Sequence, residues 1–189
     1  IQGDLAAKLI KANLQVLIFN QRSIEEILEV ILTIGRIVSA EDKAQKLVDG
    51  YKKRLDKFRE NSDKIQNKPK VYFEEWDDPT FSGIRWVSEL IEMAGGEDIF
   101  SNKSHGKLAM EREIQWSDVI EKNPDVILAS WCGKPVDIES VKQREGWSQI
   151  SAIKNNRIHE IDSSIILQPG PACLTDGLEI LESLIKGSN

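Results

Sequence analysis

Two tryptophans stand where apolar stretches of the chain end, and the residues around them are the best candidates for ligand chemistry. Trp76 follows the apolar run 71–73 and lies among four acids, Glu74, Glu75, Asp77 and Asp78. Trp131 directly follows the apolar stretch 124–130 and precedes Cys132. An indole offers a large flat face and loses little conformational entropy when it is held in place. These positions therefore predict noncovalent stacking against a bulky ligand.

Cys132 raises the alternative of covalent chemistry. A nucleophilic thiol needs a neighbouring base, and the chain has only His105, in a polar loop, and His159, within the expected strand at 157–162. Cys132 is alternatively half of a disulfide with Cys173, or a free thiol beside the site. We predict no catalytic residue, and we keep an α/β enzyme using Cys132, and a pure interaction module, as alternatives of other classes.

Other kinds of site are disfavoured by composition and motifs. A zinc or manganese site would need about four converging ligands, and two histidines make that unfavourable, so no metal site is predicted. The segment SWCGKP lacks the Ser or Thr that a phosphate loop needs after its lysine. The 189 residues carry a net charge of −6, which gives no reason to expect a nucleic acid partner. The chain starts at Ile1 rather than at methionine, so export remains open.

The apolar pattern predicts strands that alternate with helices. Residues 14–20 indicate a buried strand after a short helix at 4–12, and Ser23 begins a helix with a capping box to Glu26. The charged, proline-free stretch 40–66 predicts one long helix with a narrow apolar stripe. Beyond it we expect strands at 71–75, 124–130 and 157–162 and helices at 84–96, 115–123, 137–144 and 175–185. This alternation predicts an α/β fold with a mainly parallel sheet.

The loops after these strands should share one edge of the sheet, where parallel sheets bind their ligands. The first loop carries Trp76 with Phe81 nearby, the second carries Trp131 and Cys132, and the third carries Gln168 and Pro169. With Glu75, these are the predicted ligand-binding residues. Trp86, Trp116 and Trp147 fit helical patterns and are expected to pack within the fold or on its surface.

Three acids near the helix at 115–123 form a second candidate surface. Glu111, Glu113 and Asp118 are predicted either to dock a partner protein or to provide favourable charge at a helix N-terminus.

Several stretches together resemble a known family, the periplasmic substrate-binding proteins of cobalamin and iron-siderophore ABC importers. They occur in the order KPKVYFEEW, WVSELIEMAGGEDIF, VIEKNPDVILASWCG, GWSQISAIKNNRIHEID and ILQPGPACLTDGLEILESLI. The segments EEWDDP, ASWCGK and LQPGPA resemble the cobalamin-binding branch of that family. The likeness covers essentially the whole chain.

The resemblance implies two Rossmann-like α/β lobes joined by one long helix, with the ligand between them. Residues 1–38 would be the end of a first lobe that is only partly present, 39–68 the connecting helix and 69–189 the second lobe. A missing first-lobe segment or a partner chain would then cover residues 1–38. Ser117 stands where the family places a docking acid, with Asp118 beside it.

The resemblance also implies a function without catalysis or a resident cofactor. It implies an extracytoplasmic receptor, periplasmic or a cell-surface lipoprotein, that delivers a corrinoid such as cobalamin to ABC importer permease subunits. A siderophore-bound iron or haem is the alternative ligand.

Overall fold

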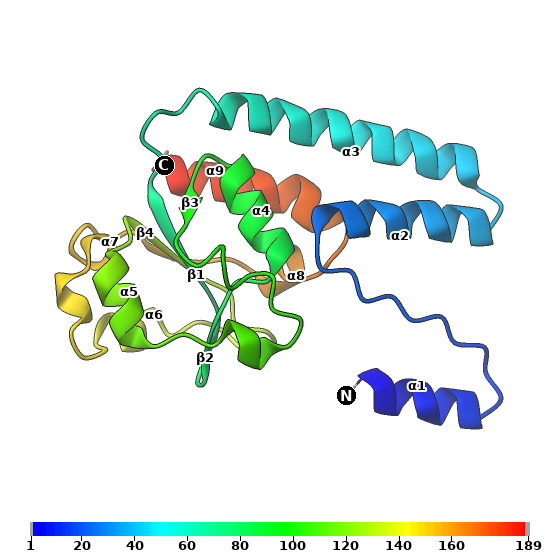
Figure 1. Ribbon diagram of the computed structural model, residues 1–189, viewed down its shortest axis with the longest axis horizontal. Helices are drawn as coiled ribbons and strands as arrows, with labels where there is room; N and C mark the ends of the chain where they lie inside the picture. The colour runs from blue at the N-terminus through cyan, green and yellow to red at the C-terminus, as the bar shows by residue number, and fades with distance from the viewer. Residues whose placement is uncertain (1, 188–189) are drawn as a thin grey trace.

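The computed structural model describes residues 2–187, and its centre is a five-stranded sheet (Figure 1). The strands lie in the order β2–β1–β4–β5, with β3 paired to β1 as well. Four strands run parallel: β1 (Lys70–Asp77), β3 (Glu97–Asp98), β4 (Val126–Ala129) and β5 (Ile158–Glu160). The short β2 (Thr80–Ser82) is antiparallel to β1. The expected α/β class with a mainly parallel sheet is confirmed.

Helices cover both faces of this sheet because the central strands are apolar on both sides. Val71 and Phe73 pack into one core, whereas Tyr72, between them, packs into the other. The first core lies under α2 (Ile24–Ile37), α3 (Glu41–Ser62), α4 (Arg85–Met93), α8 (Ser163–Ile166), the π-helical turn η3 (Cys173–Gly177) and α9 (Leu178–Lys186). The second lies under α5 (Trp116–Lys122), α6 (Ile138–Lys142), the 3₁₀ turn η2 (Trp147–Gln149) and α7 (Ser151–Lys154).

Strand β1 is longer than the sequence indicated, and this corrects the placement of Trp76. The strand continues through Asp77 and folds back as a hairpin, with Trp76 opposite Phe81 and Asp77 opposite Thr80. The Thr80 hydroxyl donates a hydrogen bond of 2.7 Å to the Asp77 carbonyl and fixes the turn. Trp76 therefore lies on the last residues of a strand, while Trp131 follows β4 in a loop, as expected.

Helix α3 is continuous through Gly50, as predicted, but it ends at Ser62 rather than at residue 66. The Ile65 N–H bonds to the Ser62 carbonyl in a turn, and the Ser62 hydroxyl donates to the Glu92 carbonyl at 2.6 Å. These contacts fix the helix end before Pro69. Only Ala44, Val48, Leu55 and Ser62 are buried, so the helix touches the rest of the fold along the narrow stripe that was expected.

The predicted strand at 14–20 is wrong. After α1 (Gln2–Lys11) these residues are extended but pair with no strand among residues 2–187, and Leu14, Leu17 and Ile18 are more than half exposed. A strand needs a neighbour for its N–H and C=O groups. The predicted exposure of apolar surface within residues 1–38 is confirmed. Figure 1 shows α1 and this segment standing apart from the sheet.

None of the helices in the described part of the chain is both long and apolar enough to cross a membrane. The division of the chain at residues 38 and 68 stays a prediction.

The crossing of α2 and α3 yields a testable contrast between two glycines. A Cβ on Gly35 would lie 2.4 Å from the Ala44 Cβ, whereas a Cβ on Gly50 would meet nothing within 4 Å. We expect Gly35→Ala to lower the free energy of unfolding by about 1–3 kcal/mol, as overpacking does. Gly50→Ala should raise it by about 0.5–1 kcal/mol because alanine favours a helix interior. Urea unfolding measures both, and an unchanged midpoint for Gly35→Ala would contradict this packing.

Candidate functional site

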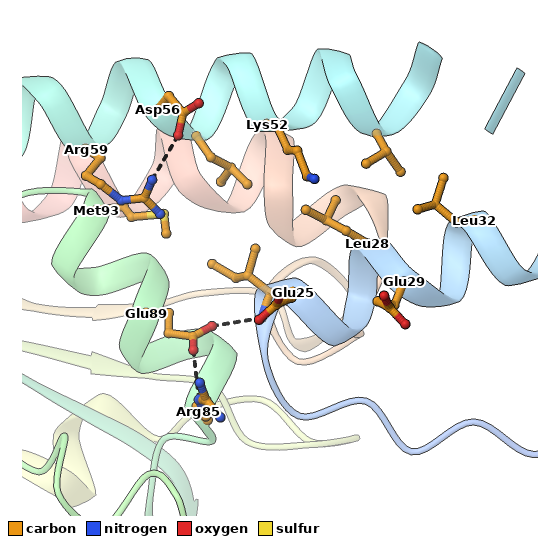
Figure 2. A pocket seen from close by; sticks show the side chains of 13 residues that line it. Glu25, Leu28, Glu29, Leu32, Lys52, Asp56, Arg59, Arg85, Glu89 and Met93 are labelled. Atoms are coloured by element: carbon orange, nitrogen blue, oxygen red, sulfur yellow. Dashed lines mark hydrogen bonds and ion pairs between the residues drawn. The ribbon is translucent and has the colours of Figure 1, made fainter. Parts of the chain in front are cut away.

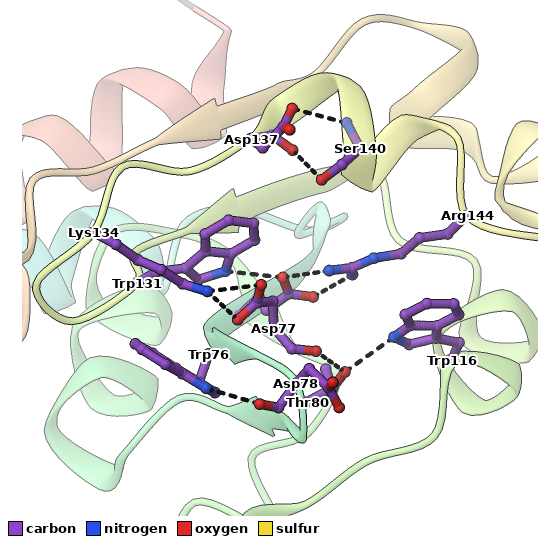
Figure 3. Close-up of polar contacts among 11 residues, drawn as sticks. Trp76, Asp77, Asp78, Thr80, Trp116, Trp131, Lys134, Asp137, Ser140 and Arg144 are labelled. Carbon is purple, nitrogen blue, oxygen red and sulfur yellow. Dashed lines mark hydrogen bonds and ion pairs between the residues drawn. The ribbon is translucent and has the colours of Figure 1, made fainter.

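Lys134 joins the two tryptophans of the predicted site (Figure 3). Its ammonium lies 4.5 Å from the centre of the Trp76 ring and 4.8 Å from the centre of the Trp131 ring. The same nitrogen donates to both carboxylate oxygens of Asp77, at 2.7 and 2.9 Å. A cation over an indole face is attracted by the ring quadrupole. Trp76, Asp77, Trp131 and Lys134 therefore form one cluster at the carboxyl edge of β1 and β4, which we call the indole–lysine cluster.

The two indoles of this cluster differ in their exposure to solvent. The Trp131 side chain is 5% exposed, and its Nε1–H donates to Glu74 at 3.0 Å. Trp76 is only half-buried, and its Nε1–H donates to the Asp78 carbonyl at 3.0 Å. Trp131 is thus largely packed into its own lobe, while Trp76 keeps accessible surface at the edge.

Beneath the cluster lies a buried network around the Glu74 carboxylate, which is fully inaccessible to solvent. It accepts hydrogen bonds from the Tyr72 hydroxyl at 2.8 Å and from both terminal nitrogens of Arg144, at 2.5 and 2.9 Å. The Arg144 guanidinium also stacks on Trp116 and Trp147. Burial, together with the Glu74 charge, raises the pKa of Tyr72 well above its usual value. The tyrosine therefore stays a neutral donor to a carboxylate that Arg144 balances.

Glu75, predicted to bind ligand, has structural partners in this lobe. Both of its carboxylate oxygens accept from Arg112, at 2.6 and 2.8 Å, and one accepts from the Ile84 N–H. Arg112, on the 3₁₀ turn η1 (Ala109–Arg112), also donates to the Ser82 carbonyl. Glu75, on β1, is therefore connected through Arg112 to η1 and through the Ile84 N–H to the N-cap of α4.

The third predicted loop is connected to the N-terminal segment. Pro169 accepts a hydrogen bond of 3.1 Å from the Gln21 side chain, and Gln168 beside it is exposed. Phe81 is half-buried opposite Trp76. A hollow of about 420 Å³ lies between the loops after β4 and β5, and it is lined by Trp131, Gly133, Lys134, Pro135, Glu160, Asp162 and Ser163. The assignment of the predicted residues to a ligand site stays a prediction.

Neither cysteine has the surroundings that covalent chemistry requires. Cys132 is exposed, Cys173 is buried, and both are free thiols, so the disulfide alternative is wrong in this structure. Within residues 2–187, Cys132 has no hydrogen bond to His105 or His159. Burial raises the pKa of Cys173 to about 11, so it stays protonated near neutrality. In the same part of the chain, no group of three His, Cys, Asp or Glu residues is placed to hold a metal ion.

The three acids predicted to dock a partner lie on η1 and at the start of α5. Glu111 accepts from the Leu108 N–H at 3.1 Å, and Asp118 accepts at 3.4 Å from the Gln115 N–H. Glu113 is exposed and its carbonyl accepts from Lys103. The helix N-terminus alternative thus describes Glu111 and Asp118, while docking stays a prediction.

A separate groove of about 510 Å³ lies between α2, α3 and α4 (Figure 2). Its floor is apolar, and Glu89 at its rim accepts from the Ile24 N–H and from Arg85, both at 2.8 Å. Glu89 therefore fixes the first residue of α2 against α4. None of the predicted ligand-binding residues lines this groove.

Sequence reasoning missed the polar residues that organise the edge. These are Glu74 as a buried acceptor, Arg144 as its cation, Arg112 as the cation of Glu75 and Lys134 as the cation of Asp77. Lys134 had a signal, since it lies three residues after Trp131 in the same loop. The two arginines had none, because their partners are 37 and 70 positions away.

Comparison with known proteins agrees with the α/β fold and shows the class of protein to which the chain belongs. Residues 2–165 match the family described as periplasmic binding protein, and the chain belongs to that family. It is 28% identical, over 96% of its length, to an uncharacterized ABC transporter substrate-binding lipoprotein of Bacillus subtilis. It is 22% identical, over 85% of its length, to the vitamin B12-binding protein of Vibrio parahaemolyticus. The matches span 57% and 56% of those proteins, about half of each curated relative.

Solved structures share the fold at lower identity. An ABC transporter substrate-binding protein from Listeria monocytogenes superposes with a TM-score of 0.83 at 21% identity, over 99% of this chain and 74% of that one. A haem-complexed protein from Staphylococcus aureus superposes with a TM-score of 0.78 at 18% identity, over 98% and 73%. The named relatives are substrate-binding proteins rather than enzymes, which disfavours the enzyme alternative based on Cys132.

The Glu74–Arg144 pair should be costly to break. Arg144→Leu leaves a carboxylate buried without its cation, and we expect the free energy of unfolding to fall by about 3–5 kcal/mol. The matched control is Glu139→Gln, which removes an exposed ion pair to Lys142 on α6 and should change stability by less than about 1 kcal/mol. Urea unfolding of both variants is the measurement. Equal losses of unfolding free energy in the two variants would show that the Glu74 network contributes no more to stability than an exposed ion pair.

The pKa of Asp77 offers a test of the Lys134 contact. Partial burial raises this pKa, but the hydrogen bond and charge of Lys134, with local backbone bonds, outweigh it and leave the pKa below its usual value. We expect Lys134→Met to raise the Asp77 pKa toward about 3.9, measured from carboxyl chemical shifts against pH. Because the pKa of Asp77 is lower in the folded protein than in the unfolded chain, the pair with Lys134 stabilises the fold at pH values above the unfolded-state pKa. This contribution is lost as the pH falls through the folded-state pKa.

The control for this titration is Asp162, whose pKa is lowered by hydrogen bonds from Ser164. Asp162 should keep its pKa in Lys134→Met. An Asp77 pKa that does not move in the variant would exclude the contact.

Proposed function

We propose that this chain is part of an extracytoplasmic receptor, periplasmic or lipid-anchored, that delivers a corrinoid such as cobalamin to an ABC importer. Membership of the periplasmic binding protein family supports the receptor role. The match to a vitamin B12-binding protein over most of this chain supports the choice of ligand. The permease subunits of the importer are the proposed partner, with Glu111, Glu113 and Asp118 at the contact.

The observation that carries the proposal is the half-buried Trp76 indole at the carboxyl edge of a parallel sheet. Parallel sheets bind ligands at this edge, and a flat macrocycle is a natural partner for an indole face. The chain supplies one wall of the site, made of Trp76, Phe81 and Lys134 with Cys132, Gln168 and Pro169 around it. A first-lobe segment covering residues 1–38 would supply the opposite wall.

The residues that could supply an axial ligand to haem iron are poorly placed, which favours a corrinoid over haem as the ligand. Haem iron takes an axial ligand from the protein, such as His, Tyr, Cys or Met. Tyr72 is fully buried and bonded to Glu74, and Met93 lies in the groove beside α3. His159 lies within β5 and is half-buried, and the exposed His105 and Met110 lie outside the predicted site. Cys132 is the exposed candidate among the predicted site residues, whereas cobalamin needs no such ligand because it carries its own axial base.

Substitution of Trp76 tests the site. Indole stacking is worth about 0.5–1.5 kcal/mol beyond area burial, so Trp76→Ala in the intact protein should weaken cyanocobalamin binding by about tenfold, which corresponds to 1.4 kcal/mol. The matched control is Trp116→Ala, a tryptophan that is 41% exposed and bonded to Thr80 outside the indole–lysine cluster. Isothermal titration measures both, with circular dichroism to confirm folding.

Unchanged affinity in Trp76→Ala would remove this indole from the site. Absence of cyanocobalamin binding by the intact wild-type protein would overturn the corrinoid ligand and leave ferric siderophores or haem as the alternatives.

A further inference from the structure

The charges at the carboxyl edge are unevenly matched. Asp77 and Asp78 belong to the hairpin that carries Trp76, and Glu160 and Asp162 line the hollow beside Trp131. Lys134 is the one basic residue that lines this hollow. The side chains of Glu160 and Asp162 are exposed, whereas Asp78 lines a different hollow beside Trp116. Three carboxylates, those of Asp77, Glu160 and Asp162, thus lie around a single ammonium.

The ammonium is already paired with a carboxylate of the protein. Lys134 bonds both oxygens of Asp77 and lies over the faces of Trp76 and Trp131, while its side chain stays 39% exposed. An anionic ligand that approached Lys134 would also meet the Asp77 carboxylate that is paired with it. The cation therefore offers little net attraction to an anion.

The other carboxylates keep their charge. Glu160 accepts only a backbone hydrogen bond, from the Val136 N–H at 3.0 Å. Asp162 accepts from the Ser164 N–H at 2.8 Å, and hydrogen bonds from the Ser164 side chain and backbone lower its pKa, so it is ionised at neutral pH. Neither forms an ion pair within the described residues. The negative potential of Glu160 and Asp162 therefore acts on a ligand in the hollow.

The indoles contribute the same sign of potential. The face of an aromatic ring is its negative side and attracts cations. The Lys134 ammonium lies over the faces of both rings, as this attraction predicts. The aromatic faces and the carboxylates therefore agree: each favours a positive or uncharged group and opposes a negative one.

We infer that the site selects uncharged or positively charged metal chelates and discriminates against polyanionic ones, with Glu160 and Asp162 as the residues that set this preference. The inference rests on the proposed function and narrows its ligand class. It separates corrinoids, which are uncharged or cationic, from the trianionic tris-catecholate complexes of iron.

The experiment compares three chelates of different charge in the intact protein. Cyanocobalamin is uncharged, diaquacobinamide is a cationic corrinoid, and a ferric tris-catecholate is a trianion. We expect the two corrinoids to bind at least about tenfold more tightly than the trianion at low ionic strength. This preference should shrink as salt is added, because exposed charges are screened.

A charge-neutral double variant tests which residues are responsible. In Glu160→Gln/Asp162→Asn the amide oxygens can still accept from the Val136 and Ser164 N–H groups, so the loop should keep its shape. The affinity for the trianion, relative to cyanocobalamin, should rise by about tenfold. The control, Glu139→Gln on α6, removes one negative charge away from the hollow and should leave the ratio unchanged.

The outcomes separate the inference from the function it rests on. Tight binding of the trianion by the wild-type protein, or an unchanged ratio in the double variant, overturns the charge preference while the receptor role stands. Failure of all three chelates to bind overturns both.

Discussion

One buried carboxylate sets the geometry of the candidate site. Glu74 lies in the middle of the sheet, fully hidden from water, where an unpaired charge would be very costly. The Tyr72 hydroxyl, the Trp131 indole and the Arg144 guanidinium all bond to it and satisfy it. Because these groups come from β1, from the loop after β4 and from the residues after α6, one acceptor fixes three segments. Trp131 is therefore held rigidly, and Lys134, three residues later, is presented to Trp76.

The neighbouring acids of this segment have different contacts and different roles. Glu74 and Glu75 point into the protein and hold Arg144 and Arg112, whereas Asp77 remains at the rim with Lys134. The four acids around Trp76 thus differ in role: Glu74 and Glu75 organise the fold, Asp77 holds Lys134, and Asp78 is exposed on the turn. A receptor that binds by contact alone depends on such preorganisation, since every side chain that must be ordered on binding reduces affinity.

Much of this fold was readable from the sequence because it rests on local patterns. Ser23 accepts from the Glu26 N–H as the capping pattern predicted, Asp137 begins α6, and Gly95 ends α4 with a positive φ. The ion pairs of Glu74 and Glu75 were not readable, because nothing local distinguishes a buried acid from an exposed one in EEWDD. The strand at 14–20 was predicted from composition, yet a strand exists only with a neighbour, and the described chain provides none.

That same segment has a consequence for handling the chain. LQVLIFN contains no charged residue, proline or glycine, and Leu14, Leu17 and Ile18 are exposed. The Leu14 N–H bonds to the Leu9 carbonyl, but the segment pairs with no strand among residues 2–187. Short, uncharged, β-prone segments of this kind are the ones that stack between chains as cross-β structure. Wherever the segment stays uncovered, molecules of this chain can associate through it. Covering of residues 14–20 would therefore keep the chain from associating with itself.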